Sequence, residues 1–202
     1  MKILVIGASG TIGKQIVSAL TDKHEIIQAN YNSGDVKIDI SDTTSIQSMF
    51  DTVGMVDAIV CATGEVAFNV FSELSRDEWD LGINSRLMGQ VNLSQIGNQY
   101  LNDGGSITLT SGIIADYPIA YGTSAATLNG AIEHFVKAVA VELPKSIRIN
   151  VVSPTVVTES LDIYGDYFPG FNSISAKDVA QYYLRSVLGV ETGQVFKAFA
   201  GN

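Results

Sequence analysis

The sequence predicts an α/β fold, a doubly wound parallel sheet with helices on both faces. Two observations lead to this prediction: apolar runs of strand length alternate with amphipathic stretches of helix length, and a glycine-rich turn joins the first strand to the first helix. A chain of 202 residues without an internal repeat fits one domain spanning residues 1–202.

In the first half of the chain, a buried strand over Lys2–Ile6 stops at glycine, and Gly10–Leu20 carries apolar residues at helical spacing. Short strands are expected next, followed by a helix with Ile46, Met49, Phe50 and Val53 on one face. These strands are Glu25–Ala29, Val36–Ile40 and Ala58–Cys61, and the helix is Ser41–Val53. Strands separated by helices imply right-handed crossovers and therefore a parallel sheet.

The second half repeats this alternation. One or two helices are expected within Asp77–Tyr100, a long helix over Ser124–Leu143, and a helix over Ser175–Leu188 that opens with a serine cap. The remaining strands are Ser106–Leu109, Ile147–Val152 and Gln194–Ala198. The long irregular stretch over 155–174 is interpreted as a short substrate lid, because structureless segments of that length in compact domains are usually functional.

Composition excludes several classes of protein. The net charge is −9, and Lys and Arg do not cluster, so a nucleic-acid partner is not expected. The single cysteine, Cys61, fits a reducing compartment and is interpreted as a core residue. No apolar stretch approaches the roughly 18 residues of a membrane helix. We expect a cytoplasmic protein without a membrane partner, and neither His24 nor His134 has a spacing that predicts a metal site.

The turn after the first strand has the spacing G-x-x-G-x-x-G. Its glycines allow a tight turn and close approach of a phosphate, while free N–H groups at the helix N-terminus face that phosphate. A glycine-rich turn without a ligand is the alternative interpretation. The context favours a Rossmann-type dinucleotide site. The cofactor-binding residues predicted here are Gly7, Ser9, Gly10, Thr11, Ile12 and Gly13.

This spacing resembles the glycine loop of the short-chain dehydrogenase/reductase family, and further segments extend the resemblance in order along nearly the whole chain. They are Asp39-Ile40-Ser41-Asp42, Ala62-Thr63-Gly64, Ile83-Asn84-Ser85, Ser111 at the end of a strand, Tyr121-Gly122-Thr123-Ser124-Ala125, and the strand 147–152 with the turn at Pro154. The resemblance implies a dinucleotide-binding fold and oxidoreductase activity.

The resemblance also implies roles for individual residues. Tyr121 would donate a proton to a carbonyl oxygen, Ser111 would orient that carbonyl, and Asn84 would carry a water relay. The further residues expected at the cofactor are Asp39, Ile40, Ala62, Thr63, Gly64, Pro154 and Val157.

The chain departs from the family at the position four residues after the tyrosine, where Ala125 replaces a lysine. A cation about 4 Å from a phenolate contributes about 4 kcal/mol at an effective dielectric near 20. Arg86 is not expected to replace it, since it lies two residues from Asn84 and so on nearly the opposite helix face. The spacing from Ser111 to Tyr121 is also short, which leaves Tyr117 as an alternative acid. Thr155 stands where a glycine is usual.

The end of the second strand decides between the two nicotinamide cofactors. An acid there would hold the ribose hydroxyls of NAD, and a basic residue would hold the phosphate of NADP. The segment Ala29-Asn30-Tyr31-Asn32-Ser33 has neither. We favour NADP over NAD, because no acid repels the phosphate and polar groups can donate to it. The residues expected there are Tyr31, Asn32 and Ser33.

Two functions remain open. The first is NADPH-dependent reduction of a small carbonyl substrate with Tyr121 as proton donor. The second is a non-catalytic NADP(H)-binding sensor or interaction protein, suggested by Ala125 and Thr155. In the family the helix that begins near Asn84 and the long helix after Tyr121 also form dimer surfaces, so we expect a homodimer or homotetramer.

Overall fold

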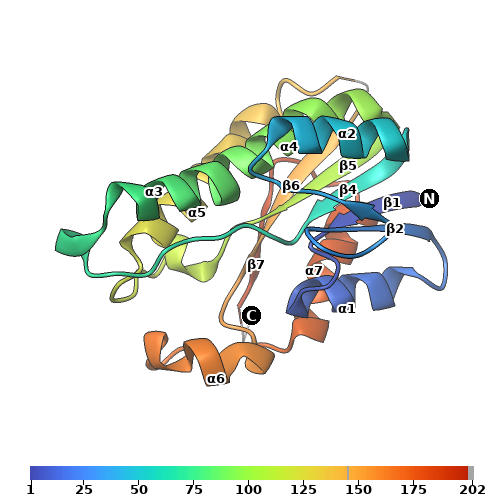
Figure 1. Cartoon of the computed structure of the whole chain (residues 1–202). Helices are drawn as coiled ribbons and strands as arrows, with labels where there is room; N and C mark the ends of the chain where they lie inside the picture. Colours follow the sequence, from blue (N-terminus) through green and yellow to red (C-terminus); the bar gives the residue numbers. More distant parts are fainter. Residues whose placement is uncertain (145, 200–202) are drawn as a thin grey trace.

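The computed structural model describes residues 1–144 and 146–199. Its centre is one seven-stranded sheet, all parallel, in the order β3-β2-β1-β4-β5-β6-β7 (Figure 1). The strands are β1 (Lys2–Ile6), β2 (Glu25–Asn30), β3 (Val36–Lys37), β4 (Val56–Cys61), β5 (Leu101–Thr110), β6 (Arg148–Pro154) and β7 (Val195–Ala198). The predicted fold class is confirmed.

Helices cover both faces of the sheet (Figure 1). α1 (Thr11–Leu20) and α7 (Ala176–Leu188) pack on one face, and α2 (Thr43–Val53), α4 (Gly89–Gly97) and α5 (Thr123–Val139) pack on the other. Successive residues of β1 alternate between these layers: Ile3 and Val5 belong to the core under α1 and α7, and Leu4 and Ile6 to the opposite core. A strand buried on both faces explains the uninterrupted apolar run of the sequence.

The predicted stretch Asp77–Tyr100 is subdivided more finely than the sequence indicated. α3 (Arg76–Gly82) opens with a capping box made by Ser75 and Glu78. A π-helical segment, Ile83–Met88, then joins α3 to α4, and a 3₁₀ turn, Asn98–Tyr100, follows. π-helical turns are frequent at functional sites, and this one contains Asn84.

The glycine loop and the turn after β4 lie side by side. β1 pairs with β2 on one side and β4 on the other, and the helices that follow β1 and β4 cover opposite faces. In open α/β sheets, ligands bind in the crevice at this point of reversal.

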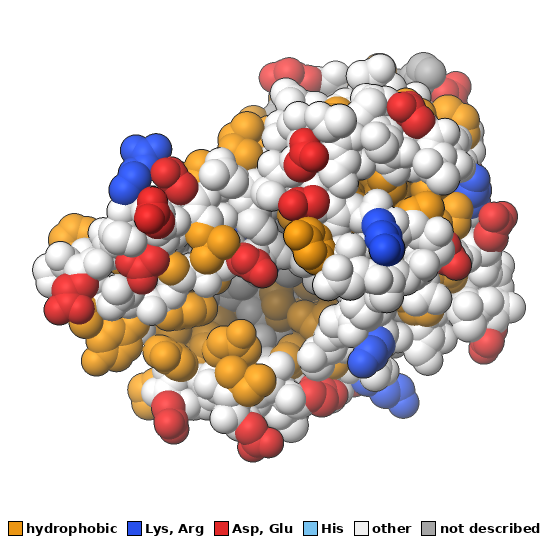
Figure 2. Space-filling view, viewed as in Figure 1, with side chains coloured by type: hydrophobic (Ala, Val, Ile, Leu, Met, Phe, Trp, Pro, Cys, Tyr) orange, Lys and Arg blue, Asp and Glu red, His pale blue; other side chains and the backbone are white. Residues whose placement is uncertain are grey.

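The predicted lid, residues 155–174, is partly helical and irregular only at its two ends. It contains two 3₁₀ turns, Thr158–Ser160 and Gly165–Tyr167, around the four-residue helix α6 (Leu161–Tyr164). Its two ends meet in a bridge between Val157 and Ile174. Figure 2 shows a hollow in this face of the molecule, with hydrophobic side chains gathered along its side nearest α3 and α6. In the part of the chain that the structure describes, no helix is long and apolar enough to cross a membrane.

Candidate active site

The glycine loop brings the end of β1 against the end of β4. Gly7 has φ +80°, and a Cβ there would lie 2.7 Å from the carbonyl oxygen of Ala62. Gly10 is the N-cap of α1 and supplies no side-chain cap. No described residue accepts from the N–H groups of Thr11, Ile12 and Gly13, which leaves a first helical turn able to bind a phosphate.

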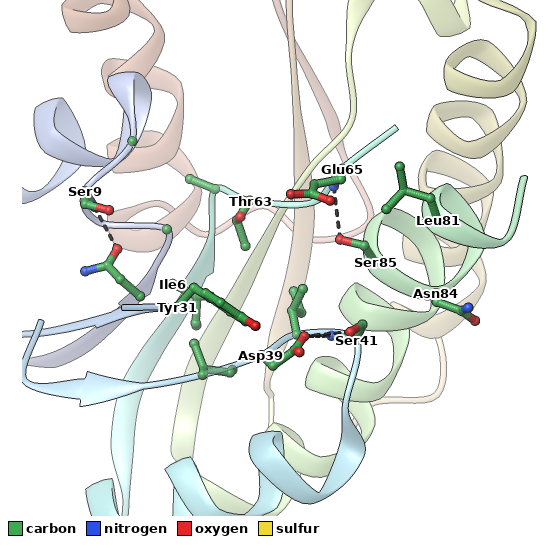
Figure 3. A pocket seen from close by; sticks show the side chains of 16 residues that line it. Ile6, Ser9, Tyr31, Asp39, Ser41, Thr63, Glu65, Leu81, Asn84 and Ser85 are labelled. Carbon is green, nitrogen blue, oxygen red and sulfur yellow. Dashed lines mark hydrogen bonds between the residues drawn. The ribbon is translucent and has the colours of Figure 1, made fainter. Parts of the chain in front are cut away.

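A cleft of about 680 Å³ opens beside this loop (Figure 3). Half of the predicted cofactor residues line it. They are Gly7, Ser9, Gly10, Tyr31, Asp39, Ile40, Ala62 and Thr63, together with the predicted relay residue Asn84.

Asn30 also lines the cleft and was not predicted. It is the last residue of β2, it is buried, and its Oδ1 accepts a hydrogen bond from the Ser9 N–H at 2.8 Å. The strand end therefore carries a neutral amide tied to the glycine loop. The sequence did show this asparagine at the correct strand end, but not which way its side chain points.

Asp39 presents a carboxylate to the same cleft. Its Oδ1 accepts from the backbone N–H of Ser41 at 2.9 Å and from the Ser41 hydroxyl at 2.6 Å (Figure 3). No bond to Oδ2 is formed by the described residues, so that oxygen is free to accept from a ligand.

Several predicted cofactor residues lie outside this lining. Thr11, Ile12 and Gly13 form the first turn of α1, where their backbone N–H groups remain available. Asn32 and Ser33 are exposed in the turn between β2 and β3. Gly64 packs against the side chain of Arg86.

Asn84 and Ser85 come from the π-helical segment. Ser85 Oγ accepts from the backbone N–H of Glu65 at 3.0 Å, which holds the chain after β4 against this segment. The amide of Asn84 is exposed and points away from the centre of the cleft (Figure 3).

A second, smaller pocket of about 240 Å³ is lined by Ser111, Pro154 and Val157 among the predicted residues. Pro154 and Val157 thus belong to this pocket and not to the larger cleft. The Ser111 hydroxyl donates to Glu133 Oε1 at 2.8 Å, and both side chains are buried. Glu133, on α5, was missed by the sequence reasoning.

Arg86 lines the smaller pocket together with Ala125. Its Nη2 donates to the Ser111 carbonyl oxygen at 2.6 Å, and Nε and Nη2 both donate to Asn129 Oδ1 at 3.2 and 3.1 Å. Nη1 makes a longer bond of 3.4 Å to the Gly64 carbonyl oxygen. The smaller pocket therefore contains a cation whose position the sequence did not predict. Burial lowers the pKa of this guanidinium.

Tyr121 is not among the residues that line either hollow. It precedes α5 with φ +64°, the residue is 51% exposed, and its ring packs edge-on against Tyr167 of the predicted lid with centroids 6.3 Å apart. The alternative acid Tyr117 is 56% exposed and packs against Phe199. Tyr121 therefore does not line the pocket that contains Ser111.

Ala125 is only 1% exposed and packs with Ile113 and Ile114 in an apolar cluster. Cys61 is fully buried at the end of β4, and burial raises its pKa to about 11, which confirms a core role. Among the described residues, no three His, Cys, Asp or Glu side chains gather closely enough to hold a metal ion.

Comparison with known proteins supports the family resemblance seen in the sequence. A family model described as enoyl-(acyl carrier protein) reductase matches residues 7–199. L-xylulose reductase from Mesocricetus auratus is 26% identical over 178 residues, which cover 79% of this chain and 73% of the relative.

Solved structures match over the full chain. A protein of Listeria innocua is 46% identical, covers 98% of this chain and 100% of its own, and superposes with a TM-score of 0.97. A small-chain dehydrogenase in complex with NADPH is 26% identical, covers 100% and 97%, and has a TM-score of 0.89. With the glycine loop, the seven-stranded sheet and a family match over nearly its whole length, the chain belongs to the short-chain dehydrogenase/reductase family and is an oxidoreductase.

Proposed function

We propose that the protein is an NADP(H)-preferring oxidoreductase that reduces a small carbonyl compound. The observation that carries this proposal is the adjacency of two hollows at the carboxyl edge of the sheet. The larger is a cleft bounded by the glycine loop, and the smaller is a mostly apolar pocket containing Ser111. Such a pocket fits a small substrate, because apolar walls with a few polar groups are typical of ligand sites.

The residues of the cleft fit a dinucleotide. The free N–H groups of Thr11 to Gly13 and the close approach at Gly7 suit a pyrophosphate, and the free Oδ2 of Asp39 suits an amino group of adenine. The bound nicotinamide would supply a hydride to the carbonyl carbon, so that the carbonyl becomes an alcohol. The NADPH complex of a related dehydrogenase supports this choice of cofactor.

The preference for NADP rests on Asn30. This neutral side chain occupies the strand end where a carboxylate would hold the ribose hydroxyls, so nothing there repels a 2′-phosphate. Tyr31, 67% exposed at the rim of the cleft, remains the proposed neighbour of that phosphate, with Asn32 and Ser33 in the adjoining turn.

Replacing Asn30 with aspartate is expected to weaken NADPH binding at least about 10-fold and to leave NADH binding unchanged or stronger. Asn30→Asp keeps an oxygen that accepts from the Ser9 N–H but adds a negative charge facing the cofactor, and a tenfold change corresponds to about 1.4 kcal/mol. Fluorescence titration with both cofactors measures the ratio of the dissociation constants for NADPH and NADH. Asp35→Asn, in the adjoining turn, is the control for a change of local charge. If this ratio of dissociation constants is unchanged, Asn30 does not determine the cofactor preference.

Tyr121 remains the proposed proton donor. Its left-handed backbone is unusual for a bulky residue, and such strain is concentrated at functional positions. Its contact with Tyr167 couples it to the lid, so a movement of the lid on substrate binding would free the ring. The Ser111 hydroxyl donates its one proton to Glu133, so this bond has to break before Ser111 can donate to a substrate carbonyl.

Tyr121→Phe is expected to lower kcat for NADPH-dependent carbonyl reduction by about 100-fold or more, because a positioned proton donor contributes 10²–10⁴-fold. NADPH affinity should not change. Tyr117→Phe, an exposed tyrosine on the neighbouring loop, is the matched control and should retain activity. A panel of ketones, aldehydes and quinones provides the assay. Equal activity of Tyr121→Phe and the parent protein would show that Tyr121 is not the proton donor.

A second candidate is a cofactor-binding sensor without turnover. The observation that favours it is that Tyr121 does not line the pocket of Ser111, while Ala125 is buried among apolar side chains. NADPH binding without consumption across the whole panel would establish it, and any Tyr121-dependent turnover would exclude it.

A further inference from the structure

The smaller pocket contains one positive charge, Arg86. All four of its contacts are to neutral oxygens: the carbonyls of Ser111 and Gly64 and, twice, the amide of Asn129. Because an arginine is not deprotonated in proteins, the guanidinium is a cation. The fold holds it at the junction of β4, β5 and α5.

This charge forms no ion pair within the described residues 1–144 and 146–199. The ion pairs that they form involve Arg76, Arg185 and Lys197, and no carboxylate lies within 4.0 Å of Arg86. The nearby carboxylate of Glu133 instead accepts from Ser111. A partly buried cation without a carboxylate is costly, so a ligand that brought the missing negative charge would gain affinity.

The donor geometry leaves room for such a ligand. Nη1 carries two N–H groups but makes one long bond of 3.4 Å, so one N–H has no acceptor among the described residues. The other walls of the pocket are largely apolar: Val66, Phe68, Ile113, Ile114 and, from the lid, Phe168. One cation in an apolar pocket of about 240 Å³ suits a small aliphatic molecule with one acidic end.

We propose that the substrate of the smaller pocket is a small oxo acid, whose carboxylate pairs with Arg86 while its aliphatic part packs against the apolar walls. This inference rests on the proposed function, because it names the class of carbonyl compound. Arginine is the residue best suited to bind a carboxylate, since its planar fork presents parallel donors. Neutral ketones of the same length would lack this interaction.

The test compares matched ligands by calorimetry on the wild-type protein bound to NADP⁺, which has no hydride to transfer and so allows binding without turnover. The probes are 2-oxopentanoate and 4-oxopentanoate, each against its methyl ester, with 2-pentanone as the neutral reference. We expect at least one carboxylate to bind 10-fold or more tightly than its ester. Equal affinity for acid and ester in both pairs would overturn the proposal, and this comparison needs no variant.

Variants then test whether Arg86 causes the tighter binding of the acid than of its ester. Arg86→Gln is expected to remove the preference for the acid, and Arg86→Lys to retain part of it, because lysine keeps the charge without the fork. Arg76→Gln makes the same charge change at an exposed position on α3 and should leave the preference intact. If Arg86→Gln keeps the full preference while remaining folded by circular dichroism, Arg86 is not the carboxylate-binding group.

Failure of this inference is distinguishable from failure of the proposed function. Reduction of neutral ketones at the same efficiency as oxo acids would refute the oxo-acid class and leave the reductase intact. Tight, Arg86-dependent binding of the acids without NADPH consumption would refute the reductase and leave the anion site intact.

Discussion

A Gly13→Ala variant is expected to lose nicotinamide cofactor binding and to unfold at a lower temperature. A Cβ at Gly13 would lie 2.0 Å from the Gly7 carbonyl oxygen, 2.8 Å from the Gly7 carbonyl carbon and 2.9 Å from the Ala8 Cα. All three are backbone atoms, so no side-chain rotation relieves the clash. The loop must open, and the N–H groups of the first turn of α1 move with it.

Overpacking costs typically 1–3 kcal/mol, and for a protein of this size each kcal/mol lowers the melting temperature by roughly 2–4 °C. We therefore expect a decrease of several degrees by differential scanning calorimetry, with no saturable NADPH binding. Gly130→Ala is the matched control: it is also a helical glycine, but nothing lies within 4 Å of its added Cβ. That variant should bind NADPH normally and be equally or more stable. Normal NADPH affinity in Gly13→Ala would refute the close packing proposed for the loop.

The glycine loop was predictable from the sequence because its requirements are local. β1 ends at Ile6, directly before Gly7, and α1 begins at Thr11 after the N-cap Gly10, which has no capping side chain. β1 has the bounds that its apolar run predicted, because both faces of that strand are covered. Where the pairing between strands is irregular, the apolar pattern did not predict the bounds of the strand. β5 begins at Leu101 and runs through polar residues before its buried part, and its register against β4 shifts there.

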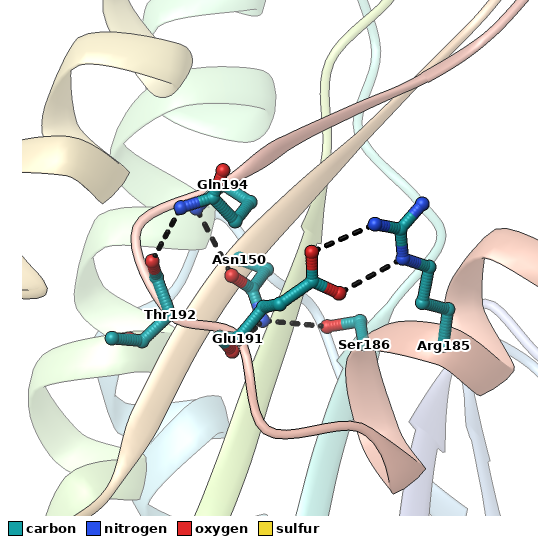
Figure 4. Close-up of polar contacts among 6 residues, drawn as sticks. All are labelled: Asn150, Arg185, Ser186, Glu191, Thr192 and Gln194. Atoms are coloured by element: carbon teal, nitrogen blue, oxygen red, sulfur yellow. Dashed lines mark hydrogen bonds and ion pairs between the residues drawn. The ribbon is translucent and has the colours of Figure 1, made fainter.

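Buried polar residues were harder to predict, because their partners come from distant parts of the chain. Asn150 lies in a strand that the sequence identified as apolar, and it is fully buried. Its amide donates to Ser186 on α7 and to the Glu191 carbonyl, and its Oδ1 accepts from the backbone N–H of Gln194 (Figure 4). Residues of the loop between α7 and β7 thus form hydrogen bonds with the buried amide of Asn150. No local sequence pattern predicts these contacts.

Arg86 illustrates the same limit within the site. Residues 83–88 are π-helical, with a wider turn, and the apolar pattern of the sequence did not predict that geometry. The acceptors of Arg86 lie 22, 25 and 43 residues away. The position of Tyr121 likewise depends on a contact with Tyr167, which belongs to the lid. The sequence indicated which residue types the site contains, and tertiary contacts decide how they are grouped.

Restoring the family's lysine by Ala125→Lys is expected to destabilise the protein and to lower its activity. The side chain at this position is buried against Ile113 and Ile114, and it lines the same small pocket as Arg86. A lysine there would place a second cation beside an unpaired one, in a pocket that it would also fill. An uncompensated buried charge typically costs 3–5 kcal/mol.

Ala125→Met separates bulk from charge, since methionine has a similar reach and no charge. We expect kcat/KM to fall in both variants, because both fill the pocket, but the free energy of unfolding to fall further in the lysine variant. NADPH affinity should stay within about 2-fold of the parent, because Ala125 does not line the cofactor cleft.

The pH dependence of the free energy of unfolding separates the effect of the lysine charge from the effect of side-chain bulk. Burial and Arg86 would hold the pKa of the introduced lysine below its unfolded value of about 10.4. Below the folded pKa the lysine is charged in both states, so the folded state has the full penalty; above the unfolded pKa it is neutral in both, and the penalty disappears. The stability gap between Ala125→Lys and Ala125→Met should therefore narrow as the pH rises toward 10. A pH-independent gap would mean that the ammonium reaches solvent, and increased turnover in Ala125→Lys would show that the site lacks a cation which Arg86 does not supply.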